Sequence, residues 1–162
     1  MYLVIGANGF LGSYIIKNIL ENTKENILAT TRKLEFCDEK DRVEWLKCEI
    51  TDDNDIINLV RKIDDREINV IYLSAYHKPD DVQANPRFAW NINITALSKI
   101  LNSLNNVRCF FYASTDSVYG NSIDAYHFKE EDSLNPENIY GIQKKTAEAL
   151  VTGYGYNVVR YP

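Results

Sequence analysis

The sequence predicts an α/β fold, built as a doubly wound parallel sheet with helices on both faces. Short apolar and β-branched runs alternate with helical patterns along the chain, and the first run leads directly into closely spaced glycines. Alternation of this kind is typical of parallel strands joined by helical crossovers. Because 162 residues are enough for one domain with a buried core, we expect a single domain over residues 1–162.

The expected strands are short runs of β-branched, aromatic and aliphatic residues, since such side chains fit a pleated, half-buried surface. The opening run Tyr-Leu-Val-Ile and the later run Val-Ile-Tyr-Leu have the composition of buried strands. In chain order, the expected strands cover residues 2–5, 27–31, 43–46, 70–73, 107–113 and 157–160.

The expected helices are identified by apolar residues that recur at helical spacing. They cover residues 10–20, 52–63, 88–104 and 136–152. The second begins with Asp and Asn, which favour helix N-termini. Its apolar residues are expected on one side, and they are Ile56, Ile57, Leu59, Val60 and Ile63. Residues 117–135 form the one long irregular stretch, and long loops in such folds often serve function.

Composition excludes several classes of protein. The net charge of −5 and the pI near 5.1 argue against nucleic acid as the main partner. No apolar run approaches the roughly 20 residues of a membrane span, and no signal peptide precedes the first strand, so we expect a cytoplasmic protein with no membrane contact. Cys37, Cys48 and Cys109 are far apart and odd in number, so reduced thiols are expected. Neither they nor His77 and His127 have the spacing of metal ligands, so no metal site is expected.

The loop after the first strand carries Gly6, Gly9 and Gly12. Glycine at these places permits a sharp turn off the strand, close approach of a pyrophosphate, and close packing of the next helix. The N–H groups at the start of that helix then attract phosphates. Three of the seven glycines lie in this loop, which favours a dinucleotide cofactor. The alternative is an ordinary strand-to-helix turn, because the spacing differs from the commoner G-x-G-x-x-G.

A second candidate site combines Tyr140 and Lys144, which share one face of an expected helix. A tyrosine hydroxyl titrates near 10, and a neighbouring lysine cation lowers that pKa toward the range useful for acid/base chemistry. Thr115 follows the strand at residues 107–113, at a carboxyl end where open α/β sheets bind ligands. The alternatives are a solvated lysine beside a half-buried tyrosine, and a Ser-Thr-Asp turn.

Several further motifs stand together in one order along the chain. They are the glycine loop, Tyr72-Leu-Ser-Ala75, Asn93, Ser114-Thr-Asp-Ser-Val-Tyr-Gly120, Asn135-Pro-Glu-Asn-Ile-Tyr140-Gly, Lys144, Glu148 and Val158-Val-Arg160. In this order they resemble the N-terminal, cofactor-binding part of the extended short-chain dehydrogenase/reductase family, which includes nucleotide-sugar epimerases, dehydratases and reductases. The resemblance extends from Met1 to Pro162 and implies a Rossmann-type fold, an NAD(P) cofactor and a nucleotide-sugar substrate.

Within that family, the segment from Ala75 to Asn93 is similar to the dTDP-4-dehydrorhamnose reductase branch. His77, Pro79 and Gln83 depart from that branch, and Val118-Tyr-Gly120 is more similar to epimerases and dehydratases. A dehydratase would carry Glu at the position of Ser117, which argues against dehydration.

The resemblance also implies roles for individual residues. Tyr140 exchanges the proton of the substrate alcohol or ketone, Lys144 lowers its pKa and holds the nicotinamide ribose, and Thr115 binds the substrate oxygen. Substrate is expected at Tyr76, Thr115, Asp116 and Ser117. The cofactor is expected at Gly6, Gly9, Phe10, Leu11, Gly12, Thr31, Arg32, Glu49, Ile50, Leu73, Ser74, Ala75, Asn93, Tyr140 and Lys144.

The end of the second strand favours NADP(H) over NAD(H). NAD enzymes of this shape usually place a carboxylate there, on the adenosine ribose. Here the segment reads Thr31-Arg32-Lys33, so no carboxylate repels a 2′-phosphate, and Arg32 is suited to bind one. The alternative is that Arg32 and Lys33 form a solvated basic turn. Glu49 and Ile50 are expected beside the adenine.

Two classes of function remain open from the sequence: a nucleotide-sugar reductase or epimerase, and a cofactor-binding regulatory protein without turnover. Because many such enzymes continue into a substrate-binding part, we expect the chain to be truncated after Pro162, with that part absent and the fragment inactive alone. The apolar pattern of the helix at 88–104 comprises Phe88, Ile92, Ile100, Leu101 and Leu104. By resemblance this helix is expected to form a homodimer interface, and core packing is the alternative.

Overall fold

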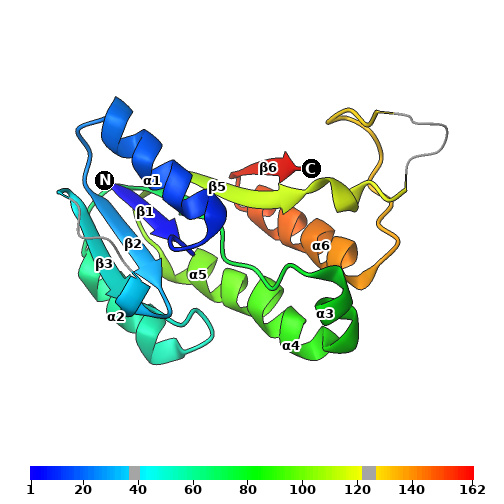
Figure 1. Cartoon of the computed structure of the whole chain (residues 1–162), viewed down its shortest axis with the longest axis horizontal. Helices are drawn as coiled ribbons and strands as arrows, with labels where there is room; N and C mark the ends of the chain where they lie inside the picture. The colour runs from blue at the N-terminus through cyan, green and yellow to red at the C-terminus, as the bar shows by residue number, and fades with distance from the viewer. Residues whose placement is uncertain (37–40, 122–126) are drawn as a thin grey trace.

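The computed structural model describes residues 1–36, 41–121 and 127–162 and contains one sheet with helices on both faces (Figure 1). Its strands are all parallel and lie in the order β3-β2-β1-β4-β5-β6. They are β1 Tyr2–Ile5, β2 Ile27–Thr31, β3 Val43–Lys47, β4 Ile68–Tyr72, β5 Val107–Thr115 and β6 Asn157–Tyr161. The predicted fold class and the six predicted strands are confirmed, with ends that differ by at most two residues.

The strand order places the reversal of winding between β1 and β4, which are direct neighbours. At such a reversal the connections leave the two strands in opposite directions, so a crevice opens outside their carboxyl ends. The register pairs Ile5 with Tyr72 at this end of the sheet. The fold therefore prepares a ligand site at the residues that follow β1 and β4.

The helices lie in two layers (Figure 1). They are α1 Phe10–Asn22, α2 Asp53–Ile63, α3 Pro79–Ala84, α4 Pro86–Trp90, α5 Leu97–Ser103 and α6 Ile139–Gly153, with short 3-10 turns at Leu34–Phe36 and Asp116–Val118 and a π-helical segment, η2, at Asn91–Ala96. Helix α1 packs with β1 and β2 on one face. Helices α2, α5 and α6 contribute to the larger core on the opposite face.

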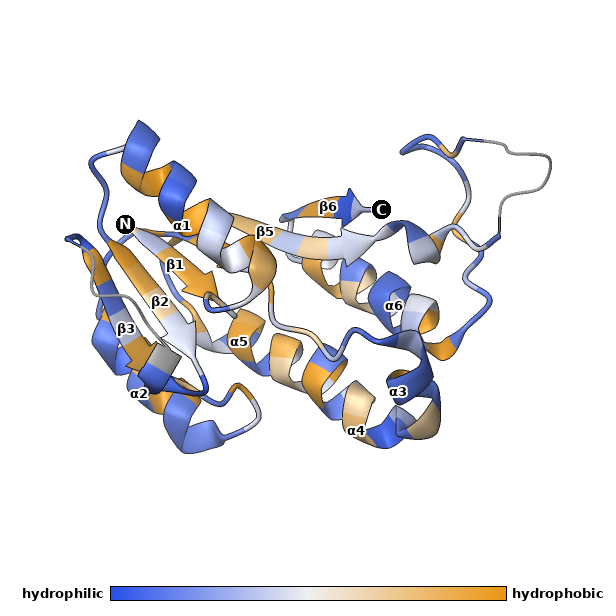
Figure 2. Cartoon of the chain, in the orientation of Figure 1, coloured by the Kyte–Doolittle hydropathy of each residue, from blue (hydrophilic) through white to orange (hydrophobic). Residues whose placement is uncertain are grey.

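The two faces are covered unequally. Figure 2 shows the strands β1 and β2 as largely hydrophobic, and they are buried between the two layers. On the α1 side of β5 and β6, by contrast, Phe111 and Val159 are 40% and 39% exposed. Phe111 alternates with the buried Phe110 and Tyr112 along β5, as the two-residue period of a strand requires, and along β6 Val159 lies between two half-buried residues. Among the described residues, this part of the sheet has no covering helix.

The predicted helix at 88–104 is continuous but irregular. Its first helical residue is Pro86, which suits the first turn of a helix because its missing N–H would have no partner there. The segment η2 then interrupts the α-helical pattern and carries Asn93 inward. Such π-helical segments are frequent at functional sites. The preceding helix α3 was not predicted from the sequence.

The apolar pattern of this helix divides into core and surface. Ile100, Leu101 and Leu104 are buried in the larger core, so core packing is correct for them. Phe88 is 56% exposed and stacks edge-on against Tyr76. In α2, Ile57 is 46% exposed whereas Ile56 and Leu59 are buried, so the prediction that it shares one side of the helix with them was wrong. A single apolar residue at the edge of a stripe is common on protein surfaces.

The last predicted helix starts later than expected. Asn138 is the N-cap of α6, and its Oδ1 accepts a hydrogen bond from the N–H of Gly141 at 2.8 Å. Residues 136 and 137 therefore belong to the loop, not to the helix. The irregular stretch predicted at 117–135 contains only the end of the 3-10 turn at Asp116–Val118 among its described residues. Cys37 lies outside the described residues, whereas Cys48 and Cys109 are free thiols.

Candidate active site

A cavity of about 500 Å³ opens at the carboxyl ends of the strands. Most of the predicted site residues line it, although they come from distant parts of the sequence. They are Gly6, Gly9, Phe10, Leu11, Gly12, Thr31, Arg32, Glu49, Ile50, Leu73, Ser74, Ala75, Tyr76, Thr115, Tyr140 and Lys144. The predicted residues Asn93, Asp116 and Ser117 do not line this cavity.

The glycine loop has the geometry that the sequence predicts. Gly6 adopts a φ of +83°, and a Cβ there would lie 2.9 Å from the backbone nitrogen of Ser74. A Cβ on Gly12 would lie only 2.2 Å from the carbonyl oxygen of Ala7. Gly9 is the N-cap of α1 and supplies no side-chain cap. The first N–H groups of α1 are therefore open to an anionic ligand, to which a helix N-terminus is attractive.

The turn after β2 presents Arg32 at the cavity. The hydroxyl of Thr31 accepts a hydrogen bond from the N–H of Lys33 and donates one to its carbonyl, both at 3.1 Å. These two hydrogen bonds fix the turn, while Arg32 stays exposed. The position predicted to meet the adenosine ribose therefore carries a guanidinium on a defined turn.

The residues after β3 line the same end of the cavity. Oε1 of Glu49 accepts hydrogen bonds from the N–H and the hydroxyl of Thr51, at 3.3 and 3.0 Å. Ile50 is buried and offers an apolar wall. Cys48, which the sequence analysis did not select, also lines the cavity; burial and nearby carboxylates raise the pKa of its thiol to about 12, so the thiol stays protonated at neutral pH.

Tyr140 and Thr115 meet at the other end of the cavity. Burial raises the pKa of Tyr140, and the nearby charge of Asp116 acts in the same direction, while a hydrogen bond with Thr115 lowers it. The net shift is upward, whereas the sequence predicts a lowered value. The reason is that burial of the phenol outweighs the hydrogen bond in this arrangement. Tyr140 is thus a neutral hydroxyl at neutral pH.

The ammonium of Lys144 is turned into the wall of the cavity. Its Nζ donates to the carbonyl of Ala113 at 2.6 Å and to the hydroxyl of Tyr112 at 3.1 Å. Burial lowers the pKa of Lys144 to about 8, against the opposing charge of Glu148. Lys144 is therefore largely charged at neutral pH, and two of its three protons are used by these partners on β5.

Asn93 is buried behind the cavity and holds the segment that follows β4. Its Oδ1 accepts from the N–H of Tyr76 at 2.8 Å, and its Nδ2 donates to the carbonyl of Tyr76 at 3.0 Å and to Gln143 at 2.8 Å. Asn93 is 1% exposed. It therefore fixes the backbone of the segment after β4 and links it to α6, while Tyr76 itself faces the cavity.

Asp116 and Ser117 line a second, larger cavity of about 1110 Å³. Thr115 caps the 3-10 turn that carries them, since its hydroxyl accepts from the N–H of Ser117 at 3.3 Å. The Thr115 hydroxyl also lies 3.2 Å from Oδ1 of Asp116. The predicted substrate residues are therefore divided between two adjoining cavities, both of which are lined by Pro162.

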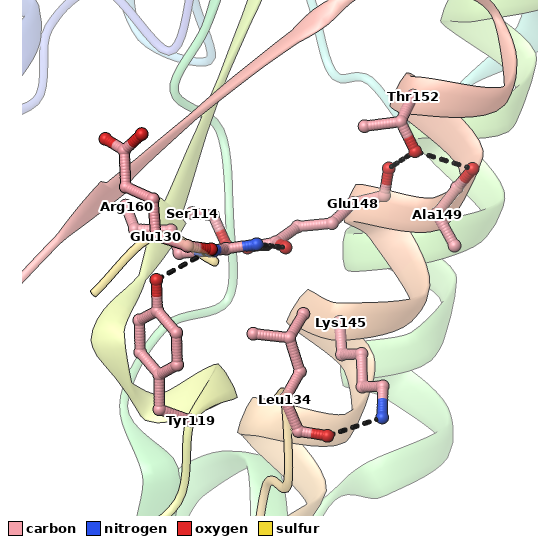
Figure 3. Close-up of polar contacts among 9 residues, drawn as sticks. All are labelled: Ser114, Tyr119, Glu130, Leu134, Lys145, Glu148, Ala149, Thr152 and Arg160. Atoms are coloured by element: carbon pink, nitrogen blue, oxygen red, sulfur yellow. Dashed lines mark hydrogen bonds and ion pairs between the residues drawn. The ribbon is translucent and has the colours of Figure 1, made fainter. Parts of the chain in front are cut away.

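A buried polar cluster ties the elements at this edge together (Figure 3). The hydroxyl of Ser114 donates to Oε1 of Glu148 at 2.5 Å, and Arg160 donates to both carboxylate oxygens of Glu148. Arg160 also donates to the hydroxyl of Tyr119 at 2.6 Å. These contacts join β5, β6, α6 and the segment after the 3-10 turn. Glu148 and Arg160 belong to the motifs that carry the family resemblance, but their contact with each other could not be predicted from the sequence because it depends on the fold.

The described part of the chain contains neither a cluster of metal ligands nor a membrane-spanning helix. No three His, Cys, Asp or Glu side chains there gather as metal ligands. Within the same residues, no helix is long and apolar enough to span a membrane.

Comparison with known sequences identifies the family to which the chain is similar. The profile described as the NAD dependent epimerase/dehydratase family matches residues 2–160. A dTDP-D-glucose 4,6-dehydratase of Mus musculus is 25% identical over 94% of this chain and 45% of its own length. The methionine adenosyltransferase 2 subunit beta of Bos taurus is 26% identical over 99% of this chain and 46% of its own length. The chain thus spans about half the length of these relatives.

Solved structures show the same fold. The UDP-glucose 4-epimerase of Thermus thermophilus, solved with NAD, superposes with a TM-score of 0.84 at 19% identity, over 98% of this chain and 53% of the other. The UDP-glucuronic acid 4-epimerase of Bacillus cereus, solved with UDP-glucuronic acid and NAD, gives a TM-score of 0.78 at 22% identity, over 98% and 55%. With the family match over nearly the whole chain, the resemblance inferred from the motifs is confirmed. This chain belongs to the NAD dependent epimerase/dehydratase family.

Proposed function

We propose that this chain is the cofactor-binding part of an NAD(P)-dependent oxidoreductase or epimerase that acts on a nucleotide sugar. The observation that carries the proposal is that one cavity brings together the glycine loop, Thr115, Tyr140 and Lys144. A binding protein without turnover needs the loop but not this combination of hydroxyl, phenol and ammonium. Relatives named as dehydratases and neighbours named as epimerases support the nucleotide-sugar class.

The glycine loop in this cavity supports a dinucleotide as the ligand. Side chains at Gly6 and Gly12 would collide with the backbone at Ser74 and Ala7, so only glycine at these positions permits the observed conformation of the loop. The uncapped start of α1 suits a pyrophosphate. Bound NAD(P) supplies the hydride that is exchanged with the sugar carbon.

The chain's own groups then handle the proton. Tyr140, kept neutral by burial, donates its proton to a substrate carbonyl oxygen or takes one from an alcohol. Thr115 holds that oxygen, and Lys144 offers its remaining N–H to the nicotinamide ribose. A neutral phenol suits the donor role, which is the direction of reduction. Ser117 provides no carboxylate for dehydration, so reduction or epimerisation is the better assignment.

The proposed cofactor is NADP(H) in preference to NAD(H). The exposed guanidinium of Arg32 lies on a turn that Thr31 fixes, and it is able to bind a 2′-phosphate through two N–H groups. Glu49 accepts from Thr51 through one carboxylate oxygen, which limits its freedom to bind a ribose.

The test is made in the natural protein that carries this chain. NADPH oxidation is followed with UDP- and dTDP-linked 4-keto sugars, and epimerisation is followed by exchange of sugar stereochemistry. Tyr140→Phe is expected to retain cofactor binding and to lower turnover by about 10²–10⁴-fold. Turnover that Tyr140→Phe leaves unchanged would refute the assignment of Tyr140.

A non-catalytic, cofactor-binding role is the second candidate, because two relatives are named as a subunit of methionine adenosyltransferase 2. The same experiment separates the two. Tight NADPH binding without consumption of cofactor, and without epimerisation of any sugar offered, supports the non-catalytic role.

A further inference from the structure

Tyr112 lies beneath the candidate active site, although sequence reasoning gave it no role. It is on β5, is 1% exposed, and its hydroxyl accepts a hydrogen bond from Nζ of Lys144 at 3.1 Å. The same Nζ lies 4.5 Å from the centre of the Tyr112 ring. The ammonium of Lys144 thus contacts both the hydroxyl and the ring of one buried tyrosine.

We propose that Tyr112 is a positioning residue, whose hydroxyl acts with the carbonyl of Ala113 to hold the Lys144 ammonium at the cavity wall. An ammonium has three donors and no acceptor, so two oxygens from β5 define its place and leave one N–H for a ligand. This inference rests on the proposed function for the importance of Lys144, but the contact itself does not depend on that function.

Energetics favour a real role for the hydroxyl. Lys144 is 4% exposed, so its ammonium loses most of its hydration, and hydrogen bonds to the charged form offset this loss. Burial raises the pKa of Tyr112 well above its ordinary value, so the phenol stays neutral and offers an oxygen lone pair throughout the physiological range. Phenylalanine at this position would keep the ring face and remove only the acceptor.

The neighbouring strand provides a natural contrast. Tyr72 on β4 is as deeply buried as Tyr112, and the two ring centres are 5.9 Å apart. Yet the hydroxyl of Tyr72 has no hydrogen-bond partner in the described structure. Two similar phenols therefore lie side by side in one core, and only one contacts Lys144. Tyr72→Phe is the matched control for Tyr112→Phe.

Apart from Tyr72, which only Tyr72→Phe removes, the other ionisable groups around Lys144 are common to both variants. Those facing the Tyr112–Lys144 pair are Tyr72 on β4, Tyr140 and Glu148 on α6, and Arg160 on β6, which is paired with Glu148, with Asp116 acting on Tyr140. Neither substitution replaces a charged residue. A change specific to Tyr112→Phe therefore reports the lost hydrogen bond and not a general electrostatic effect.

The experiment measures the pKa of Lys144 by ¹³C NMR in this chain labelled at lysine Cε, without cofactor or substrate. Lys144→Met assigns the resonance. In the unmutated chain we expect Lys144 to titrate near 8, because burial lowers its pKa. Tyr112→Phe is expected to lower this pKa by about one pH unit, since the charged form loses an acceptor. Tyr72→Phe is expected to leave it unchanged.

An unchanged Lys144 pKa in folded Tyr112→Phe, or an equal fall in Tyr72→Phe, overturns the proposal. If Tyr112→Phe does not fold, the unmutated chain labelled at tyrosine Cζ answers the same question. The Tyr112 resonance is expected to shift together with the Lys144 titration, and the Tyr72 resonance is not; a Tyr112 resonance that ignores this titration refutes the contact. Failure of NADH and NADPH binding would instead refute the proposed function and leave this result standing.

Discussion

The carboxylate of Glu148 and the guanidinium of Arg160 form a bidentate, largely buried ion pair. Nη2 of Arg160 lies 2.7 Å from Oε2, Nε lies 3.0 Å from Oε1, and the Glu148 side chain is only 6% exposed. Since Glu148 also accepts from Ser114, the pair fastens β6 and α6 to the end of β5. That end carries Thr115, so the ion pair supports the candidate active site from behind.

Loss of this carboxylate is expected to destabilise the fold. Glu148→Ala leaves Arg160 without its ion-pair partner and should lower the free energy of unfolding by about 3 kcal/mol. Chemical denaturation measures the change. Glu21→Ala is the control, because Glu21 forms an exposed pair with Lys17 at 3.9 Å, and its loss should cost less than about 0.5 kcal/mol. Equal effects would show that the buried pair has no special weight.

The close packing at the start of α1 leads to a second expectation. Gly12→Ala places a Cβ 2.2 Å from the Ala7 carbonyl, so the helix must shift, at a cost of about 1–3 kcal/mol. Gly153→Ala in α6 meets nothing within 4 Å and should stabilise the protein by about 0.5 kcal/mol. Thermal unfolding of both variants tests the pair. A harmless Gly12→Ala would contradict the description of the loop as tightly packed.

Arg32 is expected to govern the choice between cofactors. Its removal in Arg32→Ala should weaken NADPH binding by about tenfold, because a charge-assisted contact to the 2′-phosphate is lost. NADH binding should hardly change, so the ratio of the two affinities within each protein is the internal control. An unaltered ratio would mean that Arg32 is only a solvated turn residue.

The buried ammonium of Lys144 makes stability depend on pH. The folded pKa is about 8 and the ordinary value is 10.5, so between them the unfolded chain binds more protons. Stability from this group therefore rises with pH, by at most about 1.4 kcal/mol per pH unit. Above pH 9 the raised pKa of Cys48 makes stability fall with rising pH. The Lys144→Met variant has the same Cys48, so this effect is common to both proteins.

Comparison of the unmutated chain with Lys144→Met isolates the contribution of Lys144 to the pH dependence of stability. From pH 8 to 10, the free energy of unfolding of the unmutated chain should rise relative to that of Lys144→Met. Urea denaturation at a series of pH values measures this difference. A constant difference would show that Lys144 titrates normally and is not buried as a cation.

Much of the fold was predictable from local pattern. The strand segments have buried β-branched runs, and the glycine loop requires backbone conformations and approaches that glycine alone permits, as at Gly6 and Gly12. The cavity could be anticipated because carboxyl ends of parallel strands meet at one edge. Segments far apart in sequence, from Gly6 to Lys144, thereby come together.

The rest depends on contacts between elements. The direction of Lys144 is set by Tyr112 and Ala113 on a neighbouring strand, and nothing in the spacing of Tyr140 and Lys144 reports it. The raised pKa of Tyr140 likewise follows from burial, which a helical pattern does not reveal. Asn93 sits in a π-helical segment that joins Tyr76 to α6, a placement that sequence periodicity does not distinguish from a cofactor contact.

The most direct test of the account is a titration of the folded chain with NADPH and NADH, followed by nicotinamide fluorescence. We expect saturable binding of one dinucleotide per chain, tighter for NADPH, and weakened when Gly12→Ala disturbs the loop. A folded chain that binds neither dinucleotide would contradict the assignment of the cavity at the carboxyl ends of the strands as a cofactor site.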